Sequence, residues 1–202
     1  MMIPDTKLLY IDACVSVRGF SSRTATLGRA FLESWEEAHP DDAHTMVRVD
    51  KLGLKPFNEF MLRERETLAE KKNFSGRDFR HARRFQAAEQ IVVAAPYWDL
   101  TFPSWLRIYI EHISVCGLCY HYEADGCHGD CQAKRLVYLT SGGDFEKPDS
   151  LGVLYWKQLA AMFGIPNFEY VFAGGLDVAP ERVEELMAPA LARARELGAD
   201  PL

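Results

Sequence analysis

Apolar segments of two kinds alternate along the chain. Five short segments are rich in β-branched and aromatic residues, which is typical of buried strands, and they cover residues 7–13, 45–50, 90–96, 134–140 and 168–174. Between them, apolar residues recur at steps of three and four, which predicts helices over residues 27–38, 77–90, 104–115 and 151–163 and from Pro180 onward. Strand and helix therefore alternate five times.

This alternation predicts an α/β fold in which a five-stranded parallel sheet carries helices on both faces. The segments 91–95 and 136–139 are apolar or aromatic throughout, as expected for strands that are buried on both sides. Residues 52–76 and 116–133 show no clear period, and the first of these segments is expected to hold a short helix or to cover a site. Because no repeat or linker divides the chain, residues 1–202 are predicted to form a single domain.

Composition and charge narrow the possible partners. Hydrophobic residues make up 48% of the 202 positions, which is enough for a sizeable core. No run approaches the roughly 20 apolar residues of a membrane span, and the opening MMIPDTKLL lacks a signal-peptide pattern, so we expect a cytoplasmic protein with no membrane partner. The net charge of -6 and the pI near 5.5 argue against nucleic acid as a partner, so an anionic ligand must be held locally.

Hydroxyl groups gather between the first strand and the first helix, in the segment VSVRGFSSRT at 15–24. In an open parallel sheet, ligands lie beyond the carboxyl ends of the strands where the strand order reverses, and the first strand is next to that point in the order 2-1-3-4-5. The start of a helix offers unpaired backbone N–H groups and a positive dipole end, which together suit an anion. Ser22 or Thr24 fits an ordinary helix N-cap equally well.

Two further loops follow strands at the same predicted edge. Residues 94–104 carry Tyr97, Trp98 and Phe102, and residues 140–145 read TSGGDF, where missing side chains let backbone amides approach a ligand. A phosphate seat beside an aromatic loop suits a mononucleotide with a flat ring, such as a flavin, whereas packing in the core is the alternative for the aromatic residues. Neither G-x-x-x-x-G-K-[ST] nor a G-x-G-x-x-G after the first strand is present, which disfavours other nucleotide folds.

These loops are also the segments in which the chain resembles the FMN-dependent NAD(P)H:quinone oxidoreductase and azoreductase family. The resemblance rests on SVRGFSSRT, AAPYWDLTFPSWLRIYIEHI, GLCYHYEADGCHG, LTSGGDF and FGIPNFEYVFAGGLDVAPE. It implies a flavodoxin-like three-layer fold with the strand order 2-1-3-4-5, FMN as cofactor and a homodimer. It also implies NADH or NADPH as electron donor and a quinone or azo compound as acceptor, with two successive hydride transfers through the flavin.

Carried over by position, the resemblance implies a set of cofactor contacts. The FMN phosphate would be bound by Ser16, Arg18, Ser22 and Thr24. The flavin ring would be lined by Pro96, Tyr97, Trp98, Asp99 and Leu100 and by Ser141, Gly142 and Gly143, and Tyr122 would lie in the wall of the substrate pocket.

Two departures from the family pattern concern charge at the ring. Relatives commonly have asparagine where Asp99 stands, and a basic or bulky residue within the turn that contains Gly142 and Asp144 here. A carboxylate that faced the ring would disfavour the anionic reduced flavin, so we expect Asp99 to meet the cofactor through its backbone.

No side-chain nucleophile is required, because the cofactor carries the chemistry and the protein orients it. His112, His121 and His128 are candidates for proton transfer, although each fits a surface or packing role. Two alternatives stay open, namely a flavodoxin-like electron carrier without turnover of its own and a metal-binding variant built on a cysteine loop.

Four of the five cysteines crowd into one segment, as Cys116, Cys119, Cys127 and Cys131. With the nearby histidines they supply enough ligands for a tetrahedral zinc ion, yet their spacing matches neither paired C-x-x-C knuckles nor a ferredoxin run. Free thiols, a structural zinc site and redox-active thiols therefore remain as interpretations, and the odd total argues against a disulfide framework.

Overall fold

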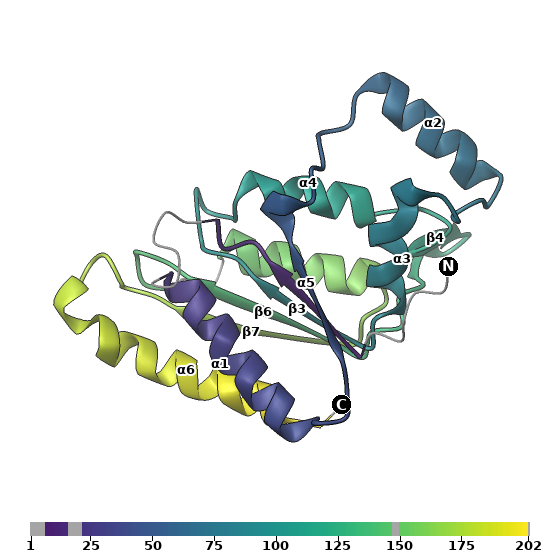
Figure 1. The fold of residues 1–202 in the computed structure, drawn as a ribbon. Coiled ribbons are helices and arrows are strands. Elements are labelled where there is room, and N and C mark those ends of the chain that lie inside the picture. Colours follow the sequence, from purple (N-terminus) through teal and green to yellow (C-terminus); the bar gives the residue numbers. More distant parts are fainter. Residues whose placement is uncertain (1–6, 16–21, 147–149, 202) are drawn as a thin grey trace.

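A computed structural model describes residues 7–15, 22–146 and 150–201. Five parallel strands form the central sheet in the order β2-β1-β3-β6-β7 (Figure 1). Their bounds are Leu8–Asp12 for β1, His44–Arg48 for β2, Gln90–Ala94 for β3, Arg135–Ser141 for β6 and Asn167–Ala173 for β7. Counted over the sheet alone, this is the order 2-1-3-4-5 expected from the sequence, so the predicted fold is confirmed.

Helices cover both faces of the sheet. Figure 1 shows α1 (Arg23–Ala38) and α6 (Val183–Ala199) on one face, and α3 (Arg80–Ala87), α4 (Ser104–Ile113) and α5 (Leu151–Met162) on the other. Short 3-10 turns precede two of them, at Arg77–Phe79 and Pro180–Arg182, and a third follows β2 at Val49–Lys51. The helix expected over 77–90 is shorter than its apolar pattern suggests, because Gln90 already pairs within β3.

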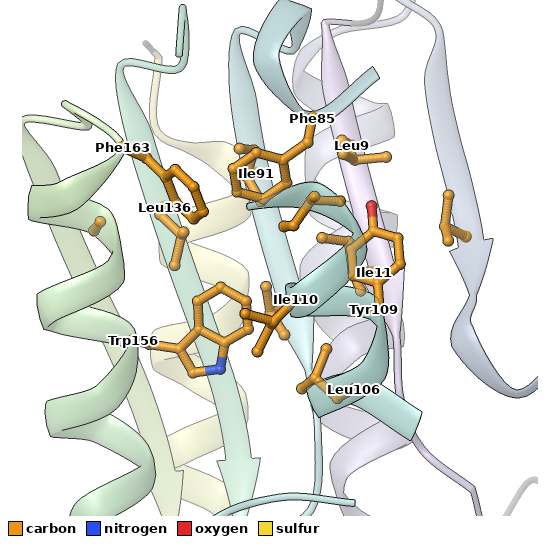
Figure 2. Packing of buried hydrophobic residues seen from close by; sticks show 14 of the residues in the cluster. Leu9, Ile11, Phe85, Ile91, Leu106, Tyr109, Ile110, Leu136, Trp156 and Phe163 are labelled. Atoms are coloured by element: carbon orange, nitrogen blue, oxygen red, sulfur yellow. The ribbon is translucent and has the colours of Figure 1, made fainter. Parts of the chain in front are cut away.

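Alternate strand residues belong to two separate hydrophobic cores, one on each face of the sheet. Leu9, Ile91 and Leu136 point to the α3, α4 and α5 side, where they pack with Trp156 and Phe163 (Figure 2). Their sequence neighbours point to the α1 and α6 side. A leucine or isoleucine buried in this way contributes about 2 kcal/mol of hydrophobic free energy. Burial on both faces explains why the strand sequences are almost continuously apolar.

The segment 52–76 contains a helix, α2 (Glu59–Glu70), none of whose residues is buried. Asn58 caps it, since the Met61 N–H donates to the Asn58 Oδ1 at 2.9 Å. Figure 1 shows α2 projecting away from the sheet. The prediction of a short helix here is confirmed. In the described part of the chain, no helix is both long and apolar enough to cross a bilayer.

The segment 116–133, expected to be irregular, forms an antiparallel hairpin of β4 (Tyr120–Glu123) and β5 (Gly126–Gly129). A two-residue loop joins the strands, and Gly126 follows it at φ 139°. The hairpin lies at the edge where the parallel strands begin: a Cβ on Gly129 would be 1.9 Å from the backbone that ends α5. Aspartate followed by glycine was the overlooked turn signal.

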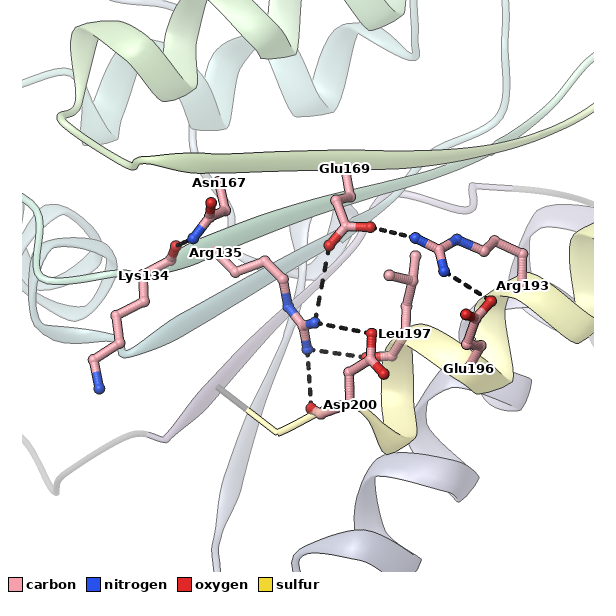
Figure 3. Close-up of polar contacts among 8 residues, drawn as sticks. All are labelled: Lys134, Arg135, Asn167, Glu169, Arg193, Glu196, Leu197 and Asp200. Atoms are coloured by element: carbon pink, nitrogen blue, oxygen red, sulfur yellow. Dashed lines mark hydrogen bonds and ion pairs between the residues drawn. The ribbon is translucent and has the colours of Figure 1, made fainter.

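A polar network closes the same edge beside α6 (Figure 3). The buried Arg135 guanidinium donates to the carbonyl oxygens of Leu197 and Asp200 at 3.0 and 3.3 Å, and it lies 4.0 Å from the Glu169 carboxylate. Arg193 pairs with Glu169 in turn and with Glu196 at 2.7 Å. The last turn of α6 is therefore tied to the first residues of β6 and β7, which leaves the opposite edge of the sheet for a site.

We expect His81 to make the fold sensitive to acid. Its side chain is 3% exposed, and burial, followed by the charges of Arg80 and Arg84, lowers its pKa to about 4. The pKa of an unfolded histidine is near 6.5. Between pH 6.5 and 4 the unfolded chain therefore binds a proton at this position and the folded chain does not. Protonation favours the unfolded state, so stability is lost as the pH falls through that window. Thermal unfolding between pH 7 and pH 4 should show a smaller loss of Tm in His81→Leu than in the parent, and equal losses would contradict this assignment.

Candidate functional site

A cavity of about 640 Å³ opens at the carboxyl edge of the sheet, where the strand order reverses between β1 and β3. This volume falls within the usual range of small-molecule sites. The described residues that line it come from the loops after all five strands and from the start of α1: Val15, Ser22, Arg23, Thr24, Arg48, Asp50, Lys51, Pro96, Tyr97, Trp98, Ser141, Gly142, Gly143 and Asp177.

The start of α1 forms one wall, and Ser22 is its N-cap. The Ala25 N–H donates to the Ser22 hydroxyl oxygen at 3.4 Å, and the Thr26 N–H donates to the Ser22 carbonyl oxygen at 3.0 Å. The capping interpretation of Ser22 is therefore confirmed. A capping hydroxyl uses only one acceptor position and can still donate its proton to an anion in the cavity, so capping and anion binding do not exclude each other here.

A buried hydrogen bond joins this wall to the end of β6. The hydroxyl oxygens of Thr24 and Ser141 are 2.6 Å apart, and both residues are buried. Residues that are 117 positions apart in the sequence thus meet at the cavity, as the prediction of a shared ligand edge requires.

The loop after β3 supplies the aromatic wall. The Tyr97 N–H donates to the Ser141 carbonyl oxygen at 2.9 Å, and the Tyr97 ring meets Phe172 edge-on at 5.5 Å. Trp98 also lines the cavity and is 46% exposed. Phe102 instead is buried and packs against Tyr155 at 5.3 Å, so the core-packing alternative holds for this residue.

A tight turn follows Trp98. The Thr101 N–H donates to the Trp98 carbonyl oxygen at 2.8 Å, and both central residues are left-handed, with φ 48° at Asp99 and 69° at Leu100. Aspartate tolerates this conformation, but leucine rarely adopts it, and such strain costs on the order of 1–3 kcal/mol. Asp99 and Leu100 are exposed beside the cavity and are not among its lining residues.

Two glycines let the loops after β6 and β7 approach each other. A Cβ on Gly143 would lie 2.5 Å from the Asp177 carboxylate, and a Cβ on Gly142 would lie 3.0 Å from the Phe172 ring. Backbone hydrogen bonds fix this contact, from the Gly142 N–H to the Ala173 carbonyl oxygen at 2.9 Å and from the Asp177 N–H to the Gly143 carbonyl oxygen at 3.0 Å. The floor of the cavity there is backbone rather than side chain.

Residues 6–197 match the family model described as a flavodoxin-like fold. The FMN-dependent NADH:quinone oxidoreductase 2 of Clostridium acetobutylicum is 32% identical to the chain over 199 residues, which cover 95% of this chain and 97% of that protein. The chain belongs to this oxidoreductase family. The resemblance inferred from the loop motifs is thereby confirmed. An FMN-dependent NADH:quinone oxidoreductase of Geobacillus kaustophilus is 30% identical over 209 residues, covering 95% of this chain and 98% of that one.

Solved structures agree on the fold. An azoreductase of Bacillus anthracis superposes with a TM-score of 0.84 at 24% identity and covers 96% of this chain and 99% of its own. An FMN-dependent NADH-azoreductase of the same species, solved in complex with FMN, gives a TM-score of 0.77 at 20% identity, with coverage of 96% and 99%.

Charged residues line the cavity of this family member, and sequence reasoning missed Arg48, Asp50, Lys51 and Asp177 among them. Arg48 lies 3.5 Å from Asp50, and Lys51 lies 3.1 Å from the same carboxylate, all at the end of β2. Arg23 pairs with Asp177 at 2.7 Å. Each cation among the described lining residues therefore already has a carboxylate partner. The position of RVDK, residues 48–51, at the end of a strand next to the reversal point was the signal that could have found the first group.

Three predicted site residues need separate mention. Ser16 and Arg18 lie outside the described residues. Tyr122 is 68% exposed on β4 and does not line the cavity, because the hairpin lies at the opposite edge of the sheet. Within one chain Tyr122 thus lies away from this cavity, and its place in the wall of a substrate pocket stays a prediction.

The cysteines do not form the sulfur-ligated zinc site considered above. All five are free, and Cys119 is buried, with its thiol 3.5 Å from the Ala82 carbonyl oxygen. In the described part of the chain, the acidic, histidine and cysteine side chains whose ligand atoms converge are Glu123, Asp125 and His128, and no cysteine joins them. Cys14 lies close to the cavity, but burial raises the pKa of its thiol strongly and nearby Asp12 adds to the effect, so it stays protonated.

We expect Thr24→Val to destabilise the protein by about 1–2 kcal/mol, because the change leaves the buried Ser141 hydroxyl without its partner. Urea denaturation would measure the loss. Thr67→Val is the matched control, since the Thr67 hydroxyl donates to a carbonyl oxygen of its own exposed helix, α2, and should change the stability little. Equal effects of the two substitutions would show that the Thr24–Ser141 contact does not hold the cavity wall.

Proposed function

We propose that this chain is an FMN-dependent oxidoreductase that uses NADH to reduce quinones or azo compounds. The family to which it belongs supports this, since its relatives are named for FMN, NADH and quinones. The observation that carries the proposal is the composition of one cavity, which combines a hydroxyl-bearing helix start, an aromatic loop and a backbone floor at the point of strand reversal. Residues 1–202 would act as a single FMN-binding domain.

The residues present fit FMN. Ser22 and Thr24, with Ser16 and Arg18 ahead of them, would hold the phosphate at the start of α1, where backbone N–H groups and the helix dipole favour an anion. A side chain at position 143 would clash with the Asp177 carboxylate, so the loop presents only backbone there. Backbone N–H and carbonyl groups can then hydrogen-bond to the edge of a ligand. When bound, FMN supplies the hydride acceptor and donor that such a reaction needs.

The remaining cofactor contacts would come from the loops after β3 and β6. Pro96, Tyr97 and Trp98 present apolar surface that excludes water from one side of the cavity. The turn through Asp99 and Leu100 holds backbone groups beside that wall, and its left-handed strain is of the kind that concentrates at functional sites. Ser141, Gly142 and Gly143 would bracket the other edge of the ring.

A homodimer in the cytoplasm completes the proposal. Large apolar side chains are exposed around the cavity mouth, in the loop after β3 and at the starts of α4 and α5, namely Trp98, Leu100, Trp105, Leu151 and Leu154. Exposed apolar surface of this kind favours association with a second chain. Five free cysteines are usual in a reducing compartment.

Anaerobic spectroscopy tests the function directly. The purified protein should be yellow or become yellow with added FMN, NADH should bleach the flavin absorbance, and a benzoquinone should restore it. A folded protein that does not bind FMN at all would refute the cofactor assignment. Retention of FMN without bleaching by either NADH or NADPH would instead identify an electron carrier.

Substitutions at Asp99 separate its backbone role from its charge. Asp99→Asn keeps a residue that tolerates a left-handed φ, so FMN affinity and the flavin reduction potential should change little. Asp99→Val places a β-branched residue at φ 48° and should weaken FMN binding by about tenfold, equivalent to 1.4 kcal/mol of the strain expected there. Fluorescence titration of FMN and spectroelectrochemistry give the two quantities. A large upward shift of the potential in Asp99→Asn would show that the carboxylate faces the ring.

A further inference from the structure

The hairpin of β4 and β5 collects histidine and carboxylate side chains on one of its faces. His121 and His128 are directly opposite each other in the antiparallel register, and Glu123 follows His121 by two residues. Side chains alternate between the faces of a strand, so these three share a face. Tyr122 and Cys127 form the neighbouring cross-strand pair and therefore belong to the opposite face.

The distances on the shared face are short. The imidazole rings of His121 and His128 stack with their centroids 5.6 Å apart. The Nε2 of His121 lies 3.2 Å from a Glu123 carboxylate oxygen, and the Nε2 of His128 lies 2.8 Å from a carboxylate oxygen of Asp125 in the loop. The ligand atoms of Glu123, Asp125 and His128 all lie within 4.8 Å of one another.

A fifth group orients one of the imidazoles. Both carboxylate oxygens of Asp130 lie close to the Nδ1 of His121, at 2.8 and 3.0 Å. A carboxylate on one ring nitrogen fixes the histidine ring and directs its other nitrogen, which is the usual arrangement behind a metal-bound histidine. In His121 that other nitrogen is the Nε2 that points to Glu123.

We propose that this face of the hairpin binds a divalent transition-metal ion such as Zn²⁺. Glu123, Asp125 and His128 supply the three ligand atoms that already converge. His121, whose Nε2 contacts Glu123 and whose ring is oriented by Asp130, completes the set when the ion draws the ligands together. Imidazole and carboxylate donors select ions of this class, whereas sulfur would be needed to favour softer ones. The site differs from the cysteine-ligated zinc site weighed from the sequence, because the thiols are not part of its donor set.

Charge supports a cation at this position. Glu123, Asp125 and Asp130 carry three negative charges against two imidazoles, so the group stays negative by one charge even with both imidazoles protonated. These side chains are exposed or only partly buried, and exposed ion pairs of this kind contribute little to stability. The stability of the hairpin alone therefore gives little reason for the cluster.

The position implies a role apart from the cavity at the carboxyl edge. The hairpin lies at the opposite edge of the sheet, and the residues that follow it bond to the ends of α3 and α5: the Gln132 N–H donates to the Gln86 carbonyl oxygen at 2.8 Å, and the Cys131 N–H donates to the Phe163 carbonyl oxygen at 3.2 Å. A metal ion there would tie the loop and both strands of the hairpin together. The inference is independent of the proposed oxidoreductase function.

Equilibrium dialysis of the full chain against Zn²⁺, after treatment with a chelator, tests the site. The parent should bind one ion per chain, and His128→Asn should weaken its affinity by at least tenfold. Asp130→Asn should weaken it by about 10–100-fold, the range found for residues that orient a metal ligand. Cys127→Ser is the matched control, because it changes the opposite face of the same strand and should leave the affinity unchanged.

Two results would overturn the proposal. One is a parent protein that binds no more zinc than a His121→Asn/His128→Asn double variant. The other is loss of binding in Cys127→Ser together with a thiolate charge-transfer band when Co²⁺ replaces Zn²⁺, which would move the site to the cysteines. A cooperative thermal unfolding transition in each variant shows that a loss of metal is not a loss of fold.

Discussion

The parallel pairing of β1 with β2 on one side and β3 on the other is the constraint on which the rest of the molecule depends. In this register Asp12 lies opposite both Arg48 and Ala94, so the three strands end at the same level. The loops that follow them must leave the sheet at one edge, and the connections on the two sides of β1 run in opposite directions. A cavity at that edge follows from the strand order before any ligand is considered.

The amino edge of the sheet contributes mainly to stability, and the carboxyl edge carries the binding cavity. At the amino edge, the Arg135 network and the hairpin at 120–129 meet the ends of α3, α5 and α6 with hydrogen bonds and close backbone contacts. At the carboxyl edge, glycines replace side chains, and the turn after Trp98 keeps a strained backbone. Because the amino edge and the two core layers hold the strands, the carboxyl edge can carry strain and an open cavity.

The fold could be predicted from the sequence because each buried strand has a recognisable short run of β-branched residues. The alternation of these runs with helices is enough to predict that the strands pair in parallel. Ser22, Thr24, Tyr97 and Trp98 could be predicted as a shared wall for the same reason, since they follow strands that end at one edge. The ion pair of Arg23 with Asp177 could not, because it joins residues 154 positions apart through two loops whose conformations no local pattern sets.

Tyr122 shows the limit more sharply. The resemblance implies a place for Tyr122 in a pocket wall, but the local sequence indicates only a hairpin and does not show at which edge of the sheet the hairpin docks. The hairpin can pack against the end of α5 because Gly129 has no side chain, and any Cβ there would clash with the backbone of Phe163 and Gly164. Alternation of faces also places Cys127 and His128 on opposite sides of β5, which the spacing of the cysteines along the sequence does not show. Free thiols, one of the interpretations left open by the sequence, agree with the structure.

The electrostatics of the cavity limit how it can hold an anion. The cations among its described lining residues are already paired, Arg23 with Asp177 and both Arg48 and Lys51 with Asp50, so they neutralise local carboxylates before they attract a ligand. The Cys14 thiol is held protonated by burial and contributes no charge. Among the described groups, attraction for an anion then comes largely from backbone N–H groups and hydroxyls at the start of α1, which are fixed in place because Ser22 caps the helix and Thr24 bonds to β6. Donors that are preorganised in this way hold a ligand in one orientation, which matters most where a ring must stay fixed while two different partners react with it in turn.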